Sequence, residues 1–281
     1  HKRGRCSMIK AGFIGTGNMG GALARAAASC GKDVKLMLAN RTAAKAEALK
    51  QAIDKAASGN VQTELCDNQS AASEADYLFL GVKPQMMEAM LDGIKDALSA
   101  RPDKPVLVTM AAGLTMDTIA RLAGGEYPVI RIMPNTPSAI GEGMVLYCAN
   151  AAVDEEKLAE FLDILKAAGR MAYIDEDHID AGSCVSGCGP AFVYLFAEAL
   201  ADGGVACGLT RKTATELAAQ TLVGAAKLML ETGENPGKLK DDVCSPGGTT
   251  IQGVRALEKG AFRGNVMDAV IAAYEKTLEL K

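Results

Sequence analysis

A glycine-rich turn near the start of the chain has the spacing of a dinucleotide-binding loop. Residues 15–20 read GTGNMG, which fits GxGxxG between an apolar run and an alanine-rich helical segment. In such a loop the first glycine allows a tight turn, the second leaves room for a pyrophosphate, and the third lets helix and strand pack closely. Backbone N–H groups at the helix start then face the phosphates. The segment predicts a nucleotide site, with an ordinary glycine turn as the alternative.

The end of the second predicted strand distinguishes between two forms of the cofactor. NAD-binding folds usually place an acidic residue there, which accepts from the ribose 2′-OH. This chain has Asn40 and Arg41 instead. A guanidinium suits a 2′-phosphate by its charge and its planar set of donors. We therefore expect NADP(H), with NAD(H) as the second cofactor to test; the alternative is that Arg41 is a solvated surface charge.

A second glycine-rich turn, SPGGTT at 245–250, precedes a predicted helix in the other half of the chain. Its glycines free the backbone, its hydroxyl groups are donors, and the helix N-terminus adds unsatisfied N–H groups. Such a turn can hold a carboxylate or phosphate without Lys or Arg. Simple N-capping by Thr249 or Thr250 is the alternative reading.

The elements that must position these turns alternate along the first half. Apolar runs separated by helical segments are typical of a parallel sheet covered on both faces. Strands are expected at 8–14, 34–39, 61–65, 77–82, 106–110, 129–133, 144–148 and 171–174, and helices at 20–30, 43–57, 85–98, 116–122 and 155–168. Ligands of such sheets bind outside the carboxyl ends of the strands. The strand ends at 82–84 (VKP), 111–113 (AAG) and 133–137 (MPNTP) are therefore expected to form a crevice for a nicotinamide.

After residue 174 the strand pattern stops, and helices are expected at 177–187, 190–207, 211–232, 236–243, 249–259 and 262–280. The fold class is therefore an α/β Rossmann-like domain with a mostly parallel, doubly wound sheet at 8–174, followed by an all-α domain at 175–281. The helical half carries few large side chains. We expect it to bury more surface by packing against a second subunit.

The composition removes several classes of function. The net charge is −4 and Trp is absent, so no nucleic-acid partner is expected. Of two histidines only His178 is not terminal, so neither a His-dependent hydrolase nor a metal site is expected. The longest uncharged stretch, 181–197, falls short of a bilayer span, and no membrane association is expected.

The eight cysteines include no CxxC pair. Scattered among small residues, they are expected to be reduced thiols of a cytoplasmic protein. The basic start, HKRGRCS, lacks the apolar run of a signal peptide.

These motifs together resemble one enzyme family. LKDDVCSPGGTTIQGVRALE at 239–258 closely resembles the signature of pyrroline-5-carboxylate reductases. GFIGTGNMG, VKP, AAG, MPNTP, SGCGPAF at 186–192 and ALADGGVACGL at 199–209 follow in the family's order, so the resemblance spans Met8 to the C-terminus. It implies reduction of L-1-pyrroline-5-carboxylate to L-proline by NAD(P)H, the last step of proline biosynthesis. It also implies a dimer whose active sites lie where one subunit's helices meet the other's cofactor domain, and dimers that often form decamers.

The resemblance also implies roles for individual residues. Thr250 would hydrogen-bond near the ring nitrogen and is the candidate catalytic residue, while Glu176 would lie near the substrate. The substrate carboxylate would be held by Ser245, Gly247, Gly248, Thr249 and Thr250. The cofactor would contact Ile14, Gly15, Thr16, Gly17, Asn18, Met19, Asn40, Arg41, Asn68, Val82, Lys83, Pro84, Ala112 and Asp242.

Two departures and two alternatives accompany this hypothesis. Cys188 replaces the family's usual Ser, and Asp242 stands where some members have Asn. A β-hydroxyacid dehydrogenase shares the GxGxMG opening, but its base is a Lys, and 182–195 contains none. A non-catalytic NADP(H)-binding protein is the other alternative, and it leaves the turn at 245–250 without a role.

Overall fold

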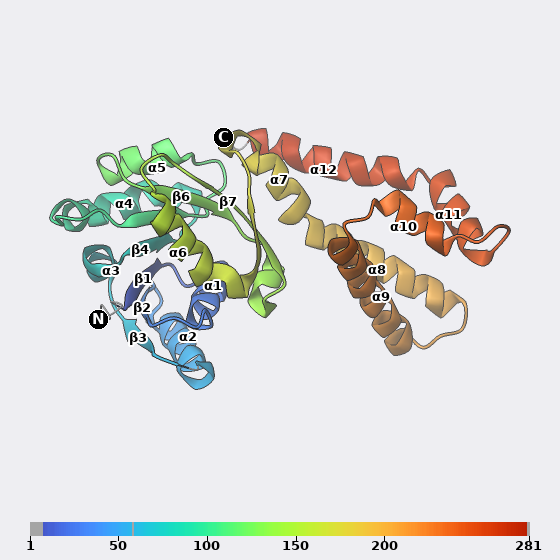
Figure 1. Ribbon diagram of the computed structural model, residues 1–281, viewed down its shortest axis with the longest axis horizontal. Helices are drawn as coiled ribbons and strands as arrows, with labels where there is room; N and C mark the ends of the chain where they lie inside the picture. The colour runs from blue at the N-terminus through green and yellow to red at the C-terminus, as the bar shows by residue number, and fades with distance from the viewer. Residues whose placement is uncertain (1–7, 58, 280–281) are drawn as a thin grey trace, which may run out of the picture. The chain divides into compact units, whose positions relative to one another are not determined.

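The computed structural model describes residues 8–57 and 59–279 (Figure 1). By their internal contacts these form two compact units. The first extends through Gly187 and includes the chain end from Tyr274, and the second spans Cys188–Ala273. The predicted division near residue 174 follows the last strand, whereas the compact units divide after the next helix, because that helix packs on the sheet.

The first unit is built on an eight-stranded sheet with the order β3-β2-β1-β4-β5-β6-β7-β8. Neighbouring strands are parallel except β6 and β7, which are antiparallel. Because β1 pairs with both β2 and β4, the strand order reverses at β1, and such a switch point is where ligands of open α/β sheets bind. The strands are β1 (Ile9–Ile14), β2 (Val34–Ala39), β3 (Val61–Leu65), β4 (Tyr77–Leu80), β5 (Val106–Thr109), β6 (Val129–Met133), β7 (Gly143–Ala149) and β8 (Gly169–Tyr173).

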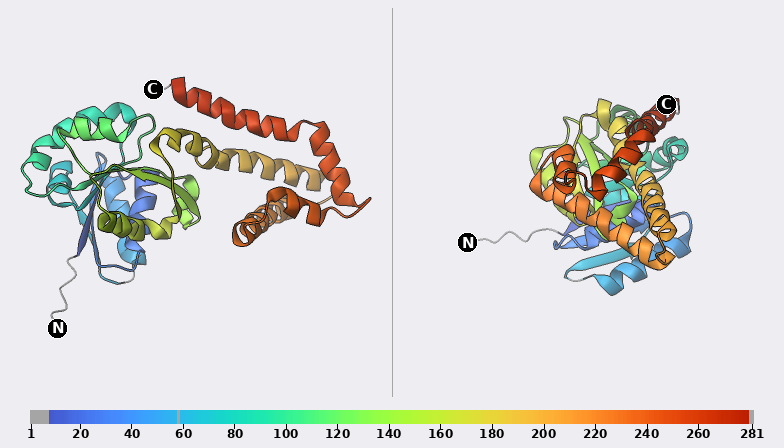
Figure 2. Two further views of the ribbon diagram at one scale, coloured as in Figure 1. Left: turned by 45° about the horizontal axis from the view of Figure 1, so that its top comes forward. Right: turned by 90° about the vertical axis from the view of Figure 1, so that its right-hand side faces the viewer.

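Helices cover both faces of this sheet, which explains the continuously apolar strands (Figures 1 and 2). One core packs the sheet against α1, α2 and α6, and it contains the stacked rings of Phe13 and Phe79. The other packs it against α3, α4 and α5. The helices are α1 (Asn18–Ala28), α2 (Ala43–Ala56), α3 (Asn68–Glu74), α4 (Pro84–Ser99), α5 (Met116–Ala123), α6 (Glu155–Leu165) and α7 (Ile179–Ser186), with short 3₁₀ segments η1 (Thr136–Ile140), η2 (Lys166–Ala168) and η3 (Glu176–His178).

The predicted fold class is confirmed, and the differences are local. Helix α3 is not among the predicted helices, because a helix of seven residues is too short for a clear apolar periodicity. The signal for α3 is its N-cap, since Asp67 accepts a hydrogen bond from the Ser70 N–H at 2.7 Å. Helix α1 begins at Asn18, earlier than the predicted residue 20, because Gly17 occupies the N-cap position.

The second unit contains α8 (Gly189–Ala206), α9 (Arg211–Thr232), α10 (Pro236–Val243), α11 (Thr249–Lys259) and most of α12 (Phe262–Glu279). Its buried apolar cluster consists of small side chains, those of Ala201, Ala214 and Ala218, with Val205 packed against them. Many large apolar side chains of this unit are exposed, among them Leu195 and Met267. Isolated soluble proteins rarely expose so much contiguous apolar surface, and such surfaces usually mark an interface.

The stretch Glu176–Ala206 has the length and mean hydropathy, 1.4, of a membrane span. Its first part is η3 and α7, which belong to the sheet unit, and it contains Asp180 in a buried ion pair. The high mean hydropathy comes mainly from α8, which exposes several large apolar side chains, among them Val193, Tyr194 and Leu195. Length and composition are therefore weak support for a membrane-spanning role.

The cysteines were predicted to be reduced thiols, and the structure describes all of them except Cys6. Cys30, Cys66, Cys148, Cys188, Cys207 and Cys244 form no disulfide, and the Cys184 Sγ lies 3.8 Å from the Thr277 Oγ1. Cys6 lies outside the described residues. Burial raises the pKa of the Cys66 and Cys148 thiols to about 11, so both are held in the neutral form at physiological pH.

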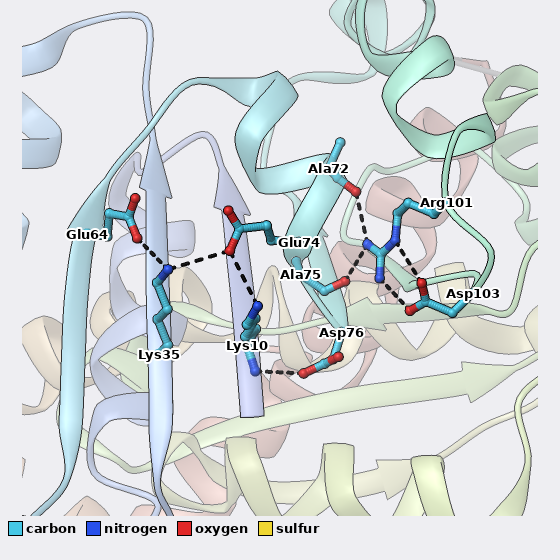
Figure 3. Close-up of polar contacts among 9 residues, drawn as sticks. All are labelled: Lys10, Lys35, Glu64, Ala72, Glu74, Ala75, Asp76, Arg101 and Asp103. Carbon is cyan, nitrogen blue, oxygen red and sulfur yellow. Dashed lines mark hydrogen bonds and ion pairs between the residues drawn. The ribbon is translucent and has the colours of Figure 1, made fainter. Parts of the chain in front are cut away.

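Polar side chains gather near the amino ends of β1, β4 and β5, away from the strand ends that the motifs occupy (Figure 3). Lys10 bridges to Glu74, which also contacts Lys35, and these two cations lower the pKa of the Glu74 carboxyl. The Arg101 guanidinium is largely buried and donates to the carbonyls of Ala72 and Ala75 at 2.9 and 2.7 Å. It therefore caps the C-terminal end of α3.

Replacing Arg101 should reduce stability. In Arg101→Met two nearly buried carbonyl groups lose their donor, and we expect the free energy of unfolding to fall by about 2–3 kcal/mol. Urea unfolding followed by circular dichroism measures this loss. Lys50→Met is the control, because its exposed pair with Asp54 should contribute less than about 0.5 kcal/mol. Equal losses in the two variants would contradict the capping role.

Candidate active site

The glycine turn between β1 and α1 lies against the end of β4. Gly15 has φ +91°, and a Cβ there would collide with the Gly81 carbonyl. A Cβ on Gly81 would in turn come within 2.6 Å of the Gly15 oxygen. The Gly81 N–H donates to the Ile14 carbonyl at 2.7 Å. Two glycines thus let the ends of β1 and β4 meet backbone to backbone, and sequence reasoning had not singled out Gly81, although a glycine at the end of a buried strand is a signal for such an approach.

The start of α1 is open in the way that a phosphate requires. A Cβ on Gly17 would meet no atom within 4 Å, whereas one on Gly20 would collide with the Gly15 carbonyl. Gly17 is the N-cap of α1, and no side chain bonds to the first N–H groups. These N–H groups and the positive end of the helix dipole therefore remain available to an anion. The three glycines behave as the GxGxxG pattern predicts.

A buried hydroxyl beside the turn supports the same interpretation. The Thr16 Oγ1 is buried and has no hydrogen-bond partner among the described residues. Buried polar groups are rarely left without a partner unless a ligand or water supplies one. The open Gly17, the uncapped helix and this hydroxyl all fit a bound dinucleotide pyrophosphate.

Asn40 and Arg41 lie at the end of β2, next to this turn. The Asn40 Oδ1 accepts from the Thr16 N–H at 3.4 Å, and its Nδ2 donates to the Thr42 carbonyl at 3.0 Å. Asn40 thus braces the glycine turn. Arg41 is exposed, and within the described part of the chain its guanidinium has no hydrogen bond or ion pair. Its charge is free to meet a 2′-phosphate.

Five more of the predicted cofactor residues also follow carboxyl ends of parallel strands. Lys83 and Pro84 lie after β4 and are exposed, Val82 is half-buried, and Ala112 is exposed after β5. Asn68 is the first residue of α3, after β3. Because β1 to β5 are parallel, these residues share one edge of the sheet. Helices α2 and α4 begin there without a side-chain cap bond, as α1 does.

The segment after β6 has a structural role that the sequence analysis did not anticipate. The Asn135 Nδ2 donates to the Ser186 carbonyl at the end of α7, at 2.9 Å. Its Oδ1 accepts from the Met144 N–H in β7, also at 2.9 Å. Asn135 therefore fastens the end of α7 to the sheet.

Glu176 belongs to a charged network at the start of the same helix. Its Oε1 accepts from the Met116 N–H at 2.8 Å and lies 3.4 Å from the Arg131 Nη1. The Arg131 Nη2 donates to the Asp180 Oδ1 at 2.9 Å. Sequence reasoning named Glu176 but missed Arg131 and Asp180. The signal for Arg131 was a charged residue within the apolar strand VIRIM, because such a residue needs a buried partner.

The turn at 245–250 leaves α11 uncapped. Gly248 occupies the N-cap position and no side chain bonds to the first N–H groups of the helix, so capping by Thr249 or Thr250 is not what the turn does. Gly247 has φ +67°, and the Gly248 N–H donates to the Ser245 carbonyl at 3.0 Å. The first turn of α11 has no acidic residue. The exposed turn therefore presents hydroxyl and N–H donors to an anion.

Asp242 lies in the second unit, near the end of α10. It is exposed and forms an ion pair with Lys238 at 2.9 Å, one helical turn earlier. Its predicted contact with the cofactor stays a prediction. The same holds for the roles of the other predicted site residues, which the geometry accommodates.

No group of three or more metal-ligating side chains occurs among the residues that the structure describes. The predicted site residues of the two units offer backbone N–H groups, hydroxyls, amides and a few charged side chains.

Comparison with known proteins identifies both halves. Residues 176–280 match the family model described as pyrroline-5-carboxylate reductase dimerisation. Residues 10–113 match that of an NADP oxidoreductase, coenzyme F420-dependent. The pyrroline-5-carboxylate reductase of Escherichia coli is 40% identical over 96% of this chain and 98% of its own.

Two solved structures agree with this assignment. A pyrroline-5-carboxylate reductase from Coxiella burnetii superposes with a TM-score of 0.86 at 34% identity, covering 96% of this chain and 98% of its own. A Plasmodium falciparum pyrroline carboxylate reductase with NADP bound gives 0.79 at 34% identity, covering 96% and 97%. The structure and these relatives confirm the resemblance that the motifs suggested: the chain belongs to the pyrroline-5-carboxylate reductase family.

Proposed function

We propose that the chain reduces L-1-pyrroline-5-carboxylate to L-proline with NADP(H), the last step of proline biosynthesis. The observation that carries this proposal is the turn at 245–250, because it provides a carboxylate site in a chain that also has an open dinucleotide turn. Reduction of a substrate that has one carboxylate needs a site for that carboxylate and a site for the dinucleotide that supplies the hydride. NAD(H) is the second cofactor that the enzyme would accept.

The chemistry asks little of the side chains. The substrate is a cyclic imine, and its protonated C=N bond accepts hydride at carbon while the nitrogen keeps its proton and becomes the amine. When bound, NADPH supplies the hydride. The protein has to position the imine and bind its carboxylate. No histidine base is required, which agrees with a sequence that has only two histidines.

The turn at 245–250 is proposed to bind the substrate. The N–H groups at the start of α11, with the hydroxyls of Ser245 and Thr249, would hold the carboxylate, and Gly247 and Gly248 allow the close approach. The Thr250 hydroxyl would hydrogen-bond near the ring nitrogen and orient it. Glu176 would lie near the substrate as a second polar contact.

The edge of the sheet is proposed to bind the cofactor. The segment from Ile14 to Met19 would contact the pyrophosphate and adjoining ribose, and Arg41 the 2′-phosphate. The remaining proposed contacts are Asn40, Asn68, Val82, Lys83, Pro84, Ala112 and Asp242.

The two alternatives have less support. A β-hydroxyacid dehydrogenase would need a lysine base on the segment from α7 into α8, and residues 182–195 contain none. A non-catalytic NADP(H)-binding protein would leave the uncapped start of α11 without a ligand. The dehydrogenase therefore lacks its base, and the binding protein leaves the second glycine turn without a role.

We also propose that the enzyme works as a cytoplasmic homodimer, with a decamer as the larger assembly. A matching dimerisation family model and the exposed apolar side chains of α8, α9 and α12 support the dimer. The small side chains of these helices let a partner helix approach closely. Thiols without disulfides support a reducing compartment.

The direct test is turnover. We expect NADPH oxidation, followed at its absorbance, to depend on added pyrroline-5-carboxylate and to yield proline. A β-hydroxyacid is the comparison substrate, assayed in the oxidative direction with NADP⁺. Turnover of the hydroxyacid alone would favour the dehydrogenase, and turnover of neither would favour the binding protein.

Arg41→Ala should separate the two cofactors. Loss of a charge-assisted contact of about 1.5–3 kcal/mol would raise the KM for NADPH about 10- to 100-fold. The KM for NADH should change by less than about twofold, because NADH has no 2′-phosphate. Lys45→Ala, an exposed cation in the first turn of α2, is the matched control. Equal changes for both cofactors would contradict the role of Arg41.

Thr250→Ala should lower kcat about 100-fold, because a hydroxyl that orients the reacting nitrogen is removed. The Kd of NADPH, measured by fluorescence, should stay within about twofold. Thr250→Ser keeps the hydroxyl and should restore most of the rate. Normal turnover in the alanine variant would remove Thr250 from the mechanism.

A further inference from the structure

Arg131 is a charged residue in the middle of the sheet. It lies in β6 between Thr109 of β5 and Cys148 of β7, and its side chain is 2% exposed. Removing a guanidinium from water is strongly unfavourable unless it is well paired. Packing alone therefore does not explain why an arginine occupies this buried position.

Two carboxylates on consecutive turns of one segment face this guanidinium. The Asp180 Oδ1 accepts from Nη2 at 2.9 Å, and the Asp180 side chain is itself only 6% exposed. The Glu176 Oε1 lies 3.4 Å from Nη1, and the Glu176 side chain is 25% exposed. Asp180 thus holds the guanidinium, and the guanidinium reaches toward Glu176, whose carboxylate is the more accessible of the two.

The two oxygens of Glu176 are used unequally. Oε1 accepts from both the Met116 N–H, at the start of α5, and the Arg131 Nη1. Within the described residues Oε2 accepts no hydrogen bond. Two donors on Oε1 fix the orientation of the carboxylate. Oε2 can therefore accept a hydrogen bond from a ligand.

We propose that Arg131, oriented by Asp180, is a positioning residue for Glu176, and that the fixed carboxylate receives a cationic N–H donor of the substrate on Oε2. The protonated ring nitrogen of a pyrroline, or the ammonium of its amine product, is a donor of this class. The inference rests on the proposed function, because that reaction supplies such a donor. Capping of α5 by Glu176 is the purely structural alternative.

The first test compares two buried arginines. Arg131→Met should raise the KM for pyrroline-5-carboxylate about tenfold, with kcat changed less than about threefold and the Kd of NADPH unchanged. Arg101→Met is the matched control, because Arg101 is also nearly buried and paired with a carboxylate. It should lower the melting temperature without changing the KM. A KM that rises equally in both variants would overturn the proposal.

Further variants separate positioning from folding. In Arg131→Met combined with Asp180→Asn the KM should stay raised, because Glu176 still lacks the guanidinium. Recovery of the KM would show a structural role only. If Arg131 acts through Glu176, the pair Arg131→Met and Glu176→Ala should have the KM of Glu176→Ala alone. A KM in the double variant that rises by the product of the two single effects would contradict this pathway.

Arg131→Lys keeps the positive charge and should recover part of the affinity for the substrate that Arg131→Met loses.

A readout without substrate distinguishes this inference from the proposed function. Hydrogen exchange of the Met116 amide should speed up at least tenfold in Arg131→Met, and not in Arg101→Met, because the carboxylate that holds it is released. Unchanged exchange would overturn the positioning role. Faster exchange in a protein whose wild type does not turn over pyrroline-5-carboxylate would uphold the fixing of Glu176 and reject the proposed reaction.

Discussion

The unsatisfied backbone N–H groups at two helix starts are the constraint on which the rest of the structure depends. Helices α1 and α11 both follow glycines, have a glycine at the N-cap, and carry no acidic residue in the first turn. Within the described chain, Asp67, Thr115, Asp154, Thr210 and Asn235 cap α3, α5, α6, α9 and α10 with their side chains, whereas α2, α4, α7 and α8 also lack a side-chain cap bond but have no glycine at the N-cap. An uncapped helix start costs stability, and an anionic ligand offsets that cost. Both ligands of the reductase reaction carry an anionic group, the pyrophosphate of the cofactor and the carboxylate of the substrate.

The same constraint explains the scarcity of catalytic side chains. Backbone donors need a turn of defined shape, and glycine provides the shape without obstructing the ligand. The contact between Gly15 and Gly81 shows how strictly the backbone is packed, because a single methyl group on either residue would collide with a carbonyl. In the proposed reaction the protein would position its ligands with peptide groups, and the hydride chemistry would belong to the cofactor.

Sequence reasoning was successful where the signal is local and failed where it depends on distant partners. The strands β1, β2 and β4 to β6 were predictable because nearly all their side chains are buried, which leaves an apolar run in the sequence. The turn before α1 was predictable because the spacing of its glycines is typical of one backbone geometry. Helix α3 was missed because its seven residues are too few for a period. Asp180 lies 49 residues from Arg131, so no local pattern joins them. The unit division after Gly187 likewise depends on α7 packing against the sheet, as the bond from Asn135 to Ser186 shows.

The buried charges beside α7 are better explained by the orientation that they give to the Glu176 carboxylate than by a contribution to stability. A buried ion pair often contributes no more than apolar residues of the same size, because desolvation offsets the attraction. The Arg131 Nε moreover has no hydrogen-bond partner among the described residues, so the guanidinium is not fully compensated. An apolar side chain in β6 would fill the space more simply. A planar guanidinium, in contrast, holds two carboxylates in fixed directions, and one of these reaches the accessible side of the unit. The buried guanidinium thus contributes little net stability, but it fixes the position of the Glu176 carboxylate. An apolar side chain at this place in β6 could not do so.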